Sequence, residues 1–178
     1  MEQAVIIKHL TDLFMQIGTW VASESLAHAE DDLTASQLLA LRFILLHPEC
    51  SLSALAEGLD ISNPAATKVM DRLERKGLVR RVQADDRRQI KATITEQGNK
   101  VGLEYMQLQL ESYTGLITGM TQSERDSLQL GLEAIVQAAV RLYPNWEQFC
   151  LQCGVGCEKD DCLLHRYRTE TDALKYRG

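Results

Sequence analysis

The stretch SLSALAEGLDISNPAATKVMDRLERKGLVRRVQADDRRQIKATITEQG, residues 51–98, is the segment around which the chain is organised. Its first part carries a short apolar helix pattern that Ser53 can cap, followed by a tight turn at Gly58 and Asp60. A second helix pattern follows and ends at Gly77, a residue suited to the position just after a helix. Two helices joined by a short turn predict a helix-turn-helix.

The second helix has clear start signals and one apolar face. Ser62 or Asn63 can accept a free backbone N–H at its start, and Pro64 suits the first turn, where no N–H is needed. Apolar residues recur at helical spacing and predict the side that packs on the core: Ala66, Val69, Met70 and Leu73. The residues on the other faces are mainly polar or charged, and these faces are left for solvent or a ligand.

Two short strands follow the second helix. Residues 79–82 form the first, and Ile90, Ala92 and Ile94 alternate with polar residues in the second, which is the period of a half-buried strand. The link between them carries the adjacent pair Arg87 and Arg88. A hairpin tip with two arginines can reach into a DNA minor groove, where narrowing concentrates negative potential.

The charge distribution supports a polyanion partner. Residues 62–91 contain nine Lys and Arg against four Asp and Glu, a local net charge of +5. The whole chain carries −6, so the remainder carries −11. One basic segment in an acidic protein is typical of a local DNA site, because phosphate neutralisation supplies most of the sequence-independent affinity.

The chain resembles the MarR family of transcriptional regulators over roughly residues 1–143. The matching positions are Leu33-Thr34, Gln37, Leu41, Leu55-Ala56, Leu59, Ile61-Ser62, Thr67, Asp71-Arg72-Leu73-Glu74, Gly77-Leu78-Val79, Asp86-Arg87-Arg88 and Thr95-Glu96-Gln97-Gly98. The resemblance implies a mainly α fold, a winged helix-turn-helix with a two-stranded β wing. It also implies a homodimer that binds a pseudo-palindromic operator in double-stranded DNA.

The expected DNA contacts fall into three groups. Candidates for base edges in the major groove are Asn63, Ala65, Thr67 and Lys68. Candidates for phosphate contacts, which set register without reading sequence, are Arg72, Arg75 and Lys91. Arg88, with Arg87, is expected in the minor groove, and Asp86 is expected to hold the wing arginine in place.

Long amphipathic helices are predicted on both sides of the winged helix. Residues 3–29 carry a broad apolar stripe that so small a winged helix cannot cover, which favours packing against a second subunit. Capping boxes begin helices at Thr34 and Thr121, and Thr95 can cap another. We therefore divide the chain into an N-terminal dimerisation helix (1–33), the winged helix-turn-helix (34–98), C-terminal dimerisation helices (99–143) and a cysteine-rich tail (144–178).

Composition narrows the class of protein. No apolar run approaches the roughly 18 residues that suggest a membrane span, and the first fifteen residues lack a signal-peptide cleavage site. A cytoplasmic protein is expected, with no membrane partner. No nucleophile–base pair, paired carboxylates or phosphate-binding glycine loop occurs, so no enzymatic activity is predicted. Cys50 is isolated and is expected to be a small buried residue.

The tail, CLQCGVGCEKDDCLLH over residues 150–165, holds four cysteines within thirteen residues: Cys150, Cys153, Cys157 and Cys162. Three interpretations stay open, namely an iron–sulfur cluster, a zinc site, and redox thiols with no metal. His165 is a spare ligand in the first two. The tail lies outside the family resemblance, which therefore assigns it no role.

The predicted function is a sequence-specific DNA-binding transcriptional regulator, a repressor in most relatives. We expect a metal or redox site in the cysteine tail to control DNA binding. If the tail instead binds zinc only as a structural metal, we expect the regulator to respond to a small molecule that binds between the two DNA-binding lobes of the dimer. The alternative is a winged-helix interaction module that carries a metal or electron-transfer tail.

Overall fold

The computed structural model describes residues 2–27, 33–83, 90–143, 164 and 166–167. Six helices and three short strands make it a mainly α protein within these ranges. In chain order they are α1 (Gln3–Ala27), α2 (Ala35–Leu46), β1 (Cys50–Ser51), α3 (Leu52–Gly58), α4 (Asn63–Arg75), β2 (Val79–Gln83), β3 (Ile90–Ile94), α5 (Glu96–Thr118) and α6 (Gln122–Leu142).

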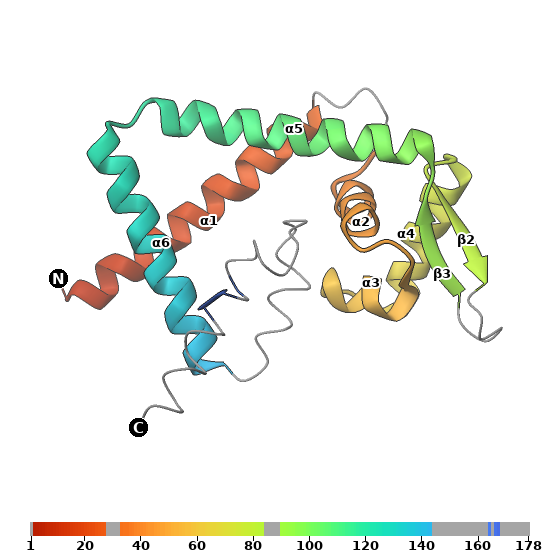
Figure 1. Ribbon diagram of the computed structural model, residues 1–178, viewed down its shortest axis with the longest axis horizontal. Helices are drawn as coiled ribbons and strands as arrows, with labels where there is room; N and C mark the ends of the chain where they lie inside the picture. Colours follow the sequence, from red (N-terminus) through yellow and green to blue (C-terminus); the bar gives the residue numbers. More distant parts are fainter. Residues whose placement is uncertain (1, 28–32, 84–89, 144–163, 165, 168–178) are drawn as a thin grey trace.

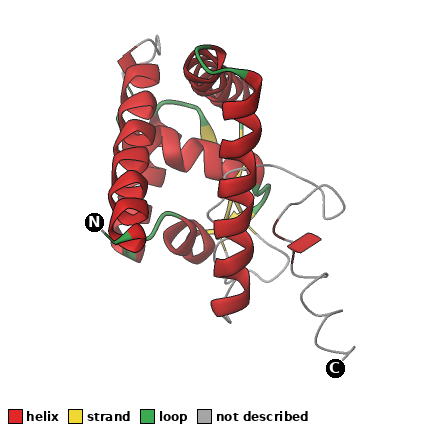
Figure 2. Cartoon of the chain, turned by 90° about the vertical axis from the view of Figure 1, so that its left-hand side faces the viewer, coloured by secondary structure: helices red, strands yellow, loops and turns green. Residues whose placement is uncertain are grey.

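The elements form two parts joined by the long helix α5 (Figure 1). At one end, α2, α3, α4 and the sheet pack into a small lobe, and α1 and α6 lie toward the other end. Helix α1 packs on α5. The side view in Figure 2 shows that α1 and α6, which cross in projection in Figure 1, stand apart. The chain therefore consists of a small lobe and a helical arm.

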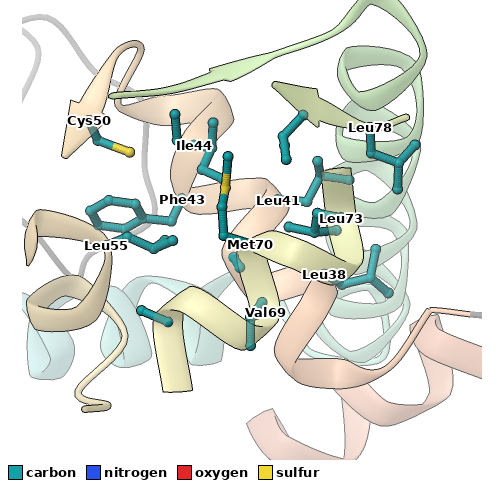
Figure 3. Packing of buried hydrophobic residues seen from close by; sticks show 14 of the residues in the cluster. Leu38, Leu41, Phe43, Ile44, Cys50, Leu55, Val69, Met70, Leu73 and Leu78 are labelled. Carbon is teal, nitrogen blue, oxygen red and sulfur yellow. The ribbon is translucent and has the colours of Figure 1, made fainter. Parts of the chain in front are cut away.

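The core of the lobe surrounds α2 (Figure 3). Leu38, Leu41 and Ile44 of α2 are fully buried, and Met70 and Leu73 of α4 pack into the same cluster. Burying one such side chain contributes about 1.5–3 kcal/mol. All four residues predicted as the apolar stripe of 62–77 are buried, so the opposite side of α4 is held at the surface.

The sheet is antiparallel, with strand order β1-β3-β2. The two predicted strands are confirmed, with Val79 opposite Ile94 and Gln83 opposite Ile90. The sequence did not reveal the third strand, β1, in which Cys50 pairs with Ala92. The predicted inward alternation of β3 holds at Ala92 but not at Ile90, which is exposed because it lies at the far end of the hairpin, beyond the core.

Local caps begin most helices as predicted. Gln37 accepts the Thr34 N–H at 2.9 Å, the Thr95 hydroxyl accepts the Gly98 N–H at 3.0 Å, and Thr121 and Glu124 form a capping box. The prediction for α3 was wrong: Ser51, not Ser53, is its cap and accepts the Ala54 N–H at 3.1 Å. Because β1 directly precedes it, α3 begins two residues earlier than the apolar pattern suggested.

Cys50 is buried, as predicted. Burial raises the pKa of its thiol to about 11, although a backbone hydrogen bond acts in the opposite direction. None of the described helices has the length and apolar content needed to cross a membrane.

Candidate nucleic-acid interface

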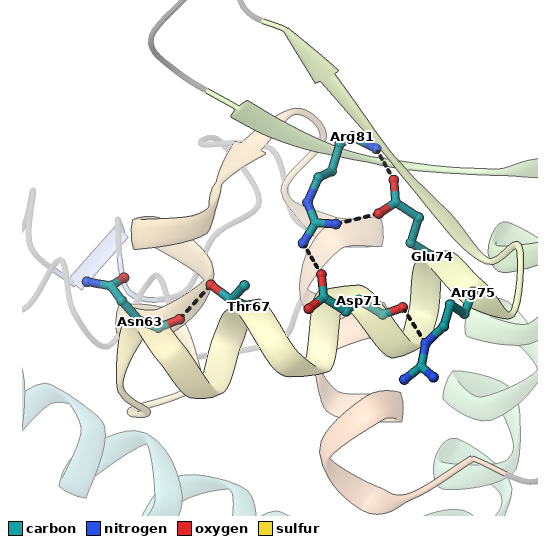
Figure 4. Close-up of polar contacts among 6 residues, drawn as sticks. All are labelled: Asn63, Thr67, Asp71, Glu74, Arg75 and Arg81. Carbon is teal, nitrogen blue, oxygen red and sulfur yellow. Dashed lines mark hydrogen bonds and ion pairs between the residues drawn. The ribbon is translucent and has the colours of Figure 1, made fainter.

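Helix α4 presents a polar face because its apolar stripe is used by the core (Figure 4). The predicted contact residues Asn63, Thr67, Lys68, Arg72 and Arg75 are all exposed, and Ala65 is half-buried. The Ser62 hydroxyl caps the helix by accepting the Ala65 N–H at 3.3 Å. The structure thus brings the predicted base and phosphate residues of α4 together on one accessible surface.

The hydroxyl of Thr67 is already engaged as a donor. It donates to the Asn63 carbonyl oxygen at 2.9 Å, one helical turn away (Figure 4). Its lone pairs and its methyl group remain available. Thr67 can therefore accept from an adenine N6 or cytosine N4 amino group, or meet a thymine methyl, without losing its internal bond.

Two of the predicted phosphate residues have internal partners. Arg75 Nε donates to the Asp71 carbonyl oxygen at 3.3 Å, which leaves the rest of its guanidinium exposed. Lys91 Nζ lies 2.9 Å from Glu49 Oε2 and forms an ion pair with it. A phosphate at Lys91 would have to compete with Glu49, whereas Arg72 and Arg75 can meet phosphate directly.

Arg81 was not predicted as a site residue, yet it joins the wing to α4. From β2 its guanidinium pairs with Asp71 at 2.6 Å and with Glu74, and its backbone N–H donates to Glu74 Oε1 at 3.1 Å. These contacts, the Asp71 hydrogen bond first, raise the pKa of Arg81 against the effect of burial. The sequence carried one signal for this contact. Side chains two residues apart in a strand lie on the same face, so Arg81 shares the inward face of the buried Val79.

The junction between the lobe and α5 is also tightly fixed. The Thr95 hydroxyl lies 2.7 Å from the Gly77 oxygen and 3.0 Å from the Leu78 oxygen, so its one proton is shared between these two acceptors. A Cβ placed on Gly98 would lie 1.9 Å from the Leu78 oxygen, so only glycine fits there. The start of α5 is therefore packed against the segment that joins α4 to β2.

A cavity of about 540 Å³ lies where α1, α2 and α5 meet. Phe14, Met15 and Leu39 supply apolar walls. Arg42 Nη1 donates to Gln109 Oε1 at 3.4 Å, and Gln109 Nε2 donates to the Tyr105 hydroxyl at 3.0 Å. Burial raises the pKa of Tyr105, opposed by the positive charge of Arg42 and the Gln109 hydrogen bond. The cavity is suited to a small, largely apolar molecule with one polar end.

Several predicted site residues lie outside the described residues. These are the wing residues Asp86, Arg87 and Arg88 and the tail residues Cys150, Cys153, Cys157, Cys162 and His165. Among the side chains that are described, no group of three or more His, Cys, Asp or Glu is placed to hold a metal ion.

A capped helix with an exposed polar and basic face, set beside two antiparallel strands, has the geometry of a winged helix-turn-helix. Helices of this motif commonly enter the DNA major groove. Residues 33–90 match the model of the MarR family. This winged-helix segment is therefore similar to the DNA-binding region of MarR-family proteins.

Solved structures share the fold. Escherichia coli MarR in its apo form is 25% identical with a TM-score of 0.62, over 72% of this chain and 95% of that one. Streptococcus pneumoniae FabT in complex with DNA is 21% identical with a TM-score of 0.64, over 80% and 100%. Staphylococcus aureus MepR bound to ethidium bromide is 19% identical with a TM-score of 0.53, over 74% and 94%. No curated protein matches the sequence.

Proposed function

We propose that this protein is a homodimeric transcriptional repressor that occupies a pseudo-palindromic operator in double-stranded DNA. The observation that carries the proposal is the exposed face of α4, on which Asn63, Thr67, Lys68, Arg72 and Arg75 gather opposite the buried stripe. FabT, which shares the fold, has been solved in complex with DNA. The N-terminal part of α4 enters the major groove, as recognition helices of this motif do.

Each residue has a distinct role in this proposal. Lys68 and Thr67 read base edges, with Asn63 and Ala65 beside them. Arg72 and Arg75 bind phosphate and set the register. Lys91 also binds phosphate, but only when its ion pair with Glu49 is broken. In the wing, Arg88 and Arg87 enter the minor groove, and Asp86 holds the arginine in place.

A second copy of this chain is the proposed partner of the helical arm. On α1, Ile6, Leu10, Leu13 and Ile17 form one stripe and are each between 39% and 60% exposed. On α6, the exposed fractions of Leu128, Leu132, Ile135 and Leu142 run from 36% to 75%. Apolar surface of this extent usually marks an interaction site. Dimerisation buries both stripes and places two α4 helices on one DNA duplex.

The proposal is tested by selecting duplexes from a random-sequence library with the purified protein. We expect enrichment of an inverted repeat with half-sites about 10 base pairs apart between centres. Lys68→Ala should then weaken binding to the selected duplex by about 5- to 150-fold, the cost of a good base contact. Lys8→Ala removes the same charge from α1 and should leave binding unchanged. Recovery of no common sequence would overturn the proposal.

We also propose that the cavity between α1, α2 and α5 binds a small-molecule effector. The chemical class that suits apolar walls and Arg42 is an aromatic compound with an acidic group. MepR, which shares the fold, has been solved with ethidium bromide bound. Benzoate should raise the melting temperature of the wild type but not of Arg42→Leu, and benzyl alcohol should have a weaker effect. Equal shifts in the two proteins would remove Arg42 from the site.

The cysteine tail is proposed as a metal site that controls the regulator. Its ligands would be Cys150, Cys153, Cys157 and Cys162, with His165 as a spare, and its occupant an iron–sulfur cluster or zinc. The reducing cytoplasm, the proposed location, keeps such thiols available. Iron, acid-labile sulfide and zinc are measured on protein purified without oxygen. Cys153→Ser should lose the metal and Cys50→Ala should retain it. Absence of both metals would leave thiol chemistry alone.

A further inference from the structure

Arg81 makes three separate contacts from one strand to one helix (Figure 4). Its guanidinium bridges Asp71, at 2.6 Å, and Glu74, which lie three residues apart on α4. Its backbone N–H donates to the second carboxylate at 3.1 Å. The Arg81 side chain is 26% exposed, while the side chains of Asp71 and Glu74 are 49% and 37% exposed. Solvent therefore screens the pairs in part, and their main effect is on geometry.

The geometry of these contacts restricts how β2 can lie against α4. A guanidinium is a planar fork with fixed donor directions, and two carboxylates on one helix face hold it in a single orientation. Arg81 is two residues from Gln83, where β2 ends before the hairpin link. A displacement or rotation of the wing would therefore break the contacts to both carboxylates.

We propose that Arg81 is a positioning residue that sets the offset between α4 and the wing, so that both reach adjacent grooves of one DNA duplex together. This inference rests on the proposed function and adds to it a residue that does not itself need to contact DNA. Its contribution is geometric, because α4 and the hairpin can bind the same duplex only at one separation.

The adjacent Arg80 supplies a matched control. It lies on the same strand, is exposed, and takes part in no ion pair with any described residue. Arg80→Gln and Arg81→Gln thus remove the same charge one residue apart, but only the second breaks the contacts with α4. Arg81→Lys keeps the charge without the fork, since an ammonium is a point charge.

The experiment uses the full-length dimer and two probes: the duplex that the wild type selects from a random library, and a scrambled duplex of the same composition. Arg81→Gln should bind the selected duplex at least about fivefold more weakly than Arg80→Gln does, the cost of a lost groove contact. Both variants should bind the scrambled duplex alike. Arg81→Lys should fall between wild type and Arg81→Gln.

Footprinting separates positioning from a general loss of structure. Hydroxyl-radical protection of the flanking minor groove should disappear in Arg81→Gln, while protection of major-groove guanines from methylation should persist. Equal affinities and footprints in Arg81→Gln and Arg80→Gln would overturn the inference. So would loss of the folded dimer in both Arg81→Gln and Arg81→Lys, which would make Arg81 a residue needed for folding. A wild type that selects no sequence would instead refute the proposed function itself.

Discussion

Gly98→Ala should destabilise the protein because the first turn of α5 packs closely against the backbone of Leu78, in the segment between α4 and β2. A Cβ at this position would lie 1.9 Å from the Leu78 carbonyl oxygen, well inside any allowed contact. The opposing atom is backbone, so no side-chain rotation can relieve the clash. The first turn of α5 must move away by about 1 Å or more to restore an ordinary C···O separation.

The expected magnitude follows from what that movement disrupts. Overpacking costs about 1–3 kcal/mol, and losing the cap in which Thr95 accepts the Gly98 N–H at 3.0 Å costs about 1 kcal/mol more. The higher helix propensity of alanine returns up to about 1 kcal/mol. The net loss in the free energy of unfolding is about 1–3 kcal/mol, and the melting temperature falls by about 2–12 °C for a protein of this size.

Gly115→Ala in the same helix is the matched control. Apart from the backbone of its own helix, a Cβ there meets no atom of the described residues within 4 Å, so the substitution should stabilise the protein by about 0.5–1 kcal/mol. Both variants are measured by urea unfolding followed by circular dichroism, at equal protein concentration. If Gly98→Ala is as stable as the wild type, the close approach of α5 to Leu78 is wrong.

Three further predictions concern the core, the arm and the wing. Because the pKa of the Cys50 thiol is raised to about 11, the folded state keeps its proton above the usual titration range, so stability should fall as pH rises from about 9 to 11. Cys50→Ala should remove that part of the decline in pH-dependent urea unfolding, and identical profiles would contradict it. Leu13→Glu places a charge on the exposed α1 stripe and should shift sedimentation toward monomer, whereas Gln16→Glu should not. Arg88→Ala should weaken operator binding at least about tenfold, the cost of a lost minor-groove contact; unchanged affinity in a folded dimer would exclude the wing from binding.

The sequence predicted the features of the lobe that depend on neighbouring residues. The buried stripe of α4 and its cap follow from spacing within a few residues, and Ser62 is the cap where Ser62 or Asn63 was predicted. The predicted caps at Thr95 of α5 and at Thr121 of α6, in the arm, are present for the same reason. The antiparallel pairing of β2 with β3 also follows from the sequence, which predicted a strand at residues 79–82 and an alternating strand at 90–94 joined by a short link.

Features that depend on distant residues could not be predicted in this way. Strand β1 has only two residues and exists because Cys50 meets Ala92 across the sheet. Lys91 was expected to meet phosphate, but its ion pair joins it to Glu49, 42 residues away. The ion pairs of Arg81 likewise need the packed positions of α4 and β2. Such contacts become visible only when the chain is folded.

Sequence-specific binding by a dimer is tested by measuring the affinity of the wild type for its selected duplex and for a scrambled duplex, at the same salt concentration, together with the number of chains bound. Two chains per duplex and a preference of about 1,000-fold or more are predicted for a dimer that reads base edges through α4. Equal affinities, or saturation by one chain per duplex, would contradict it.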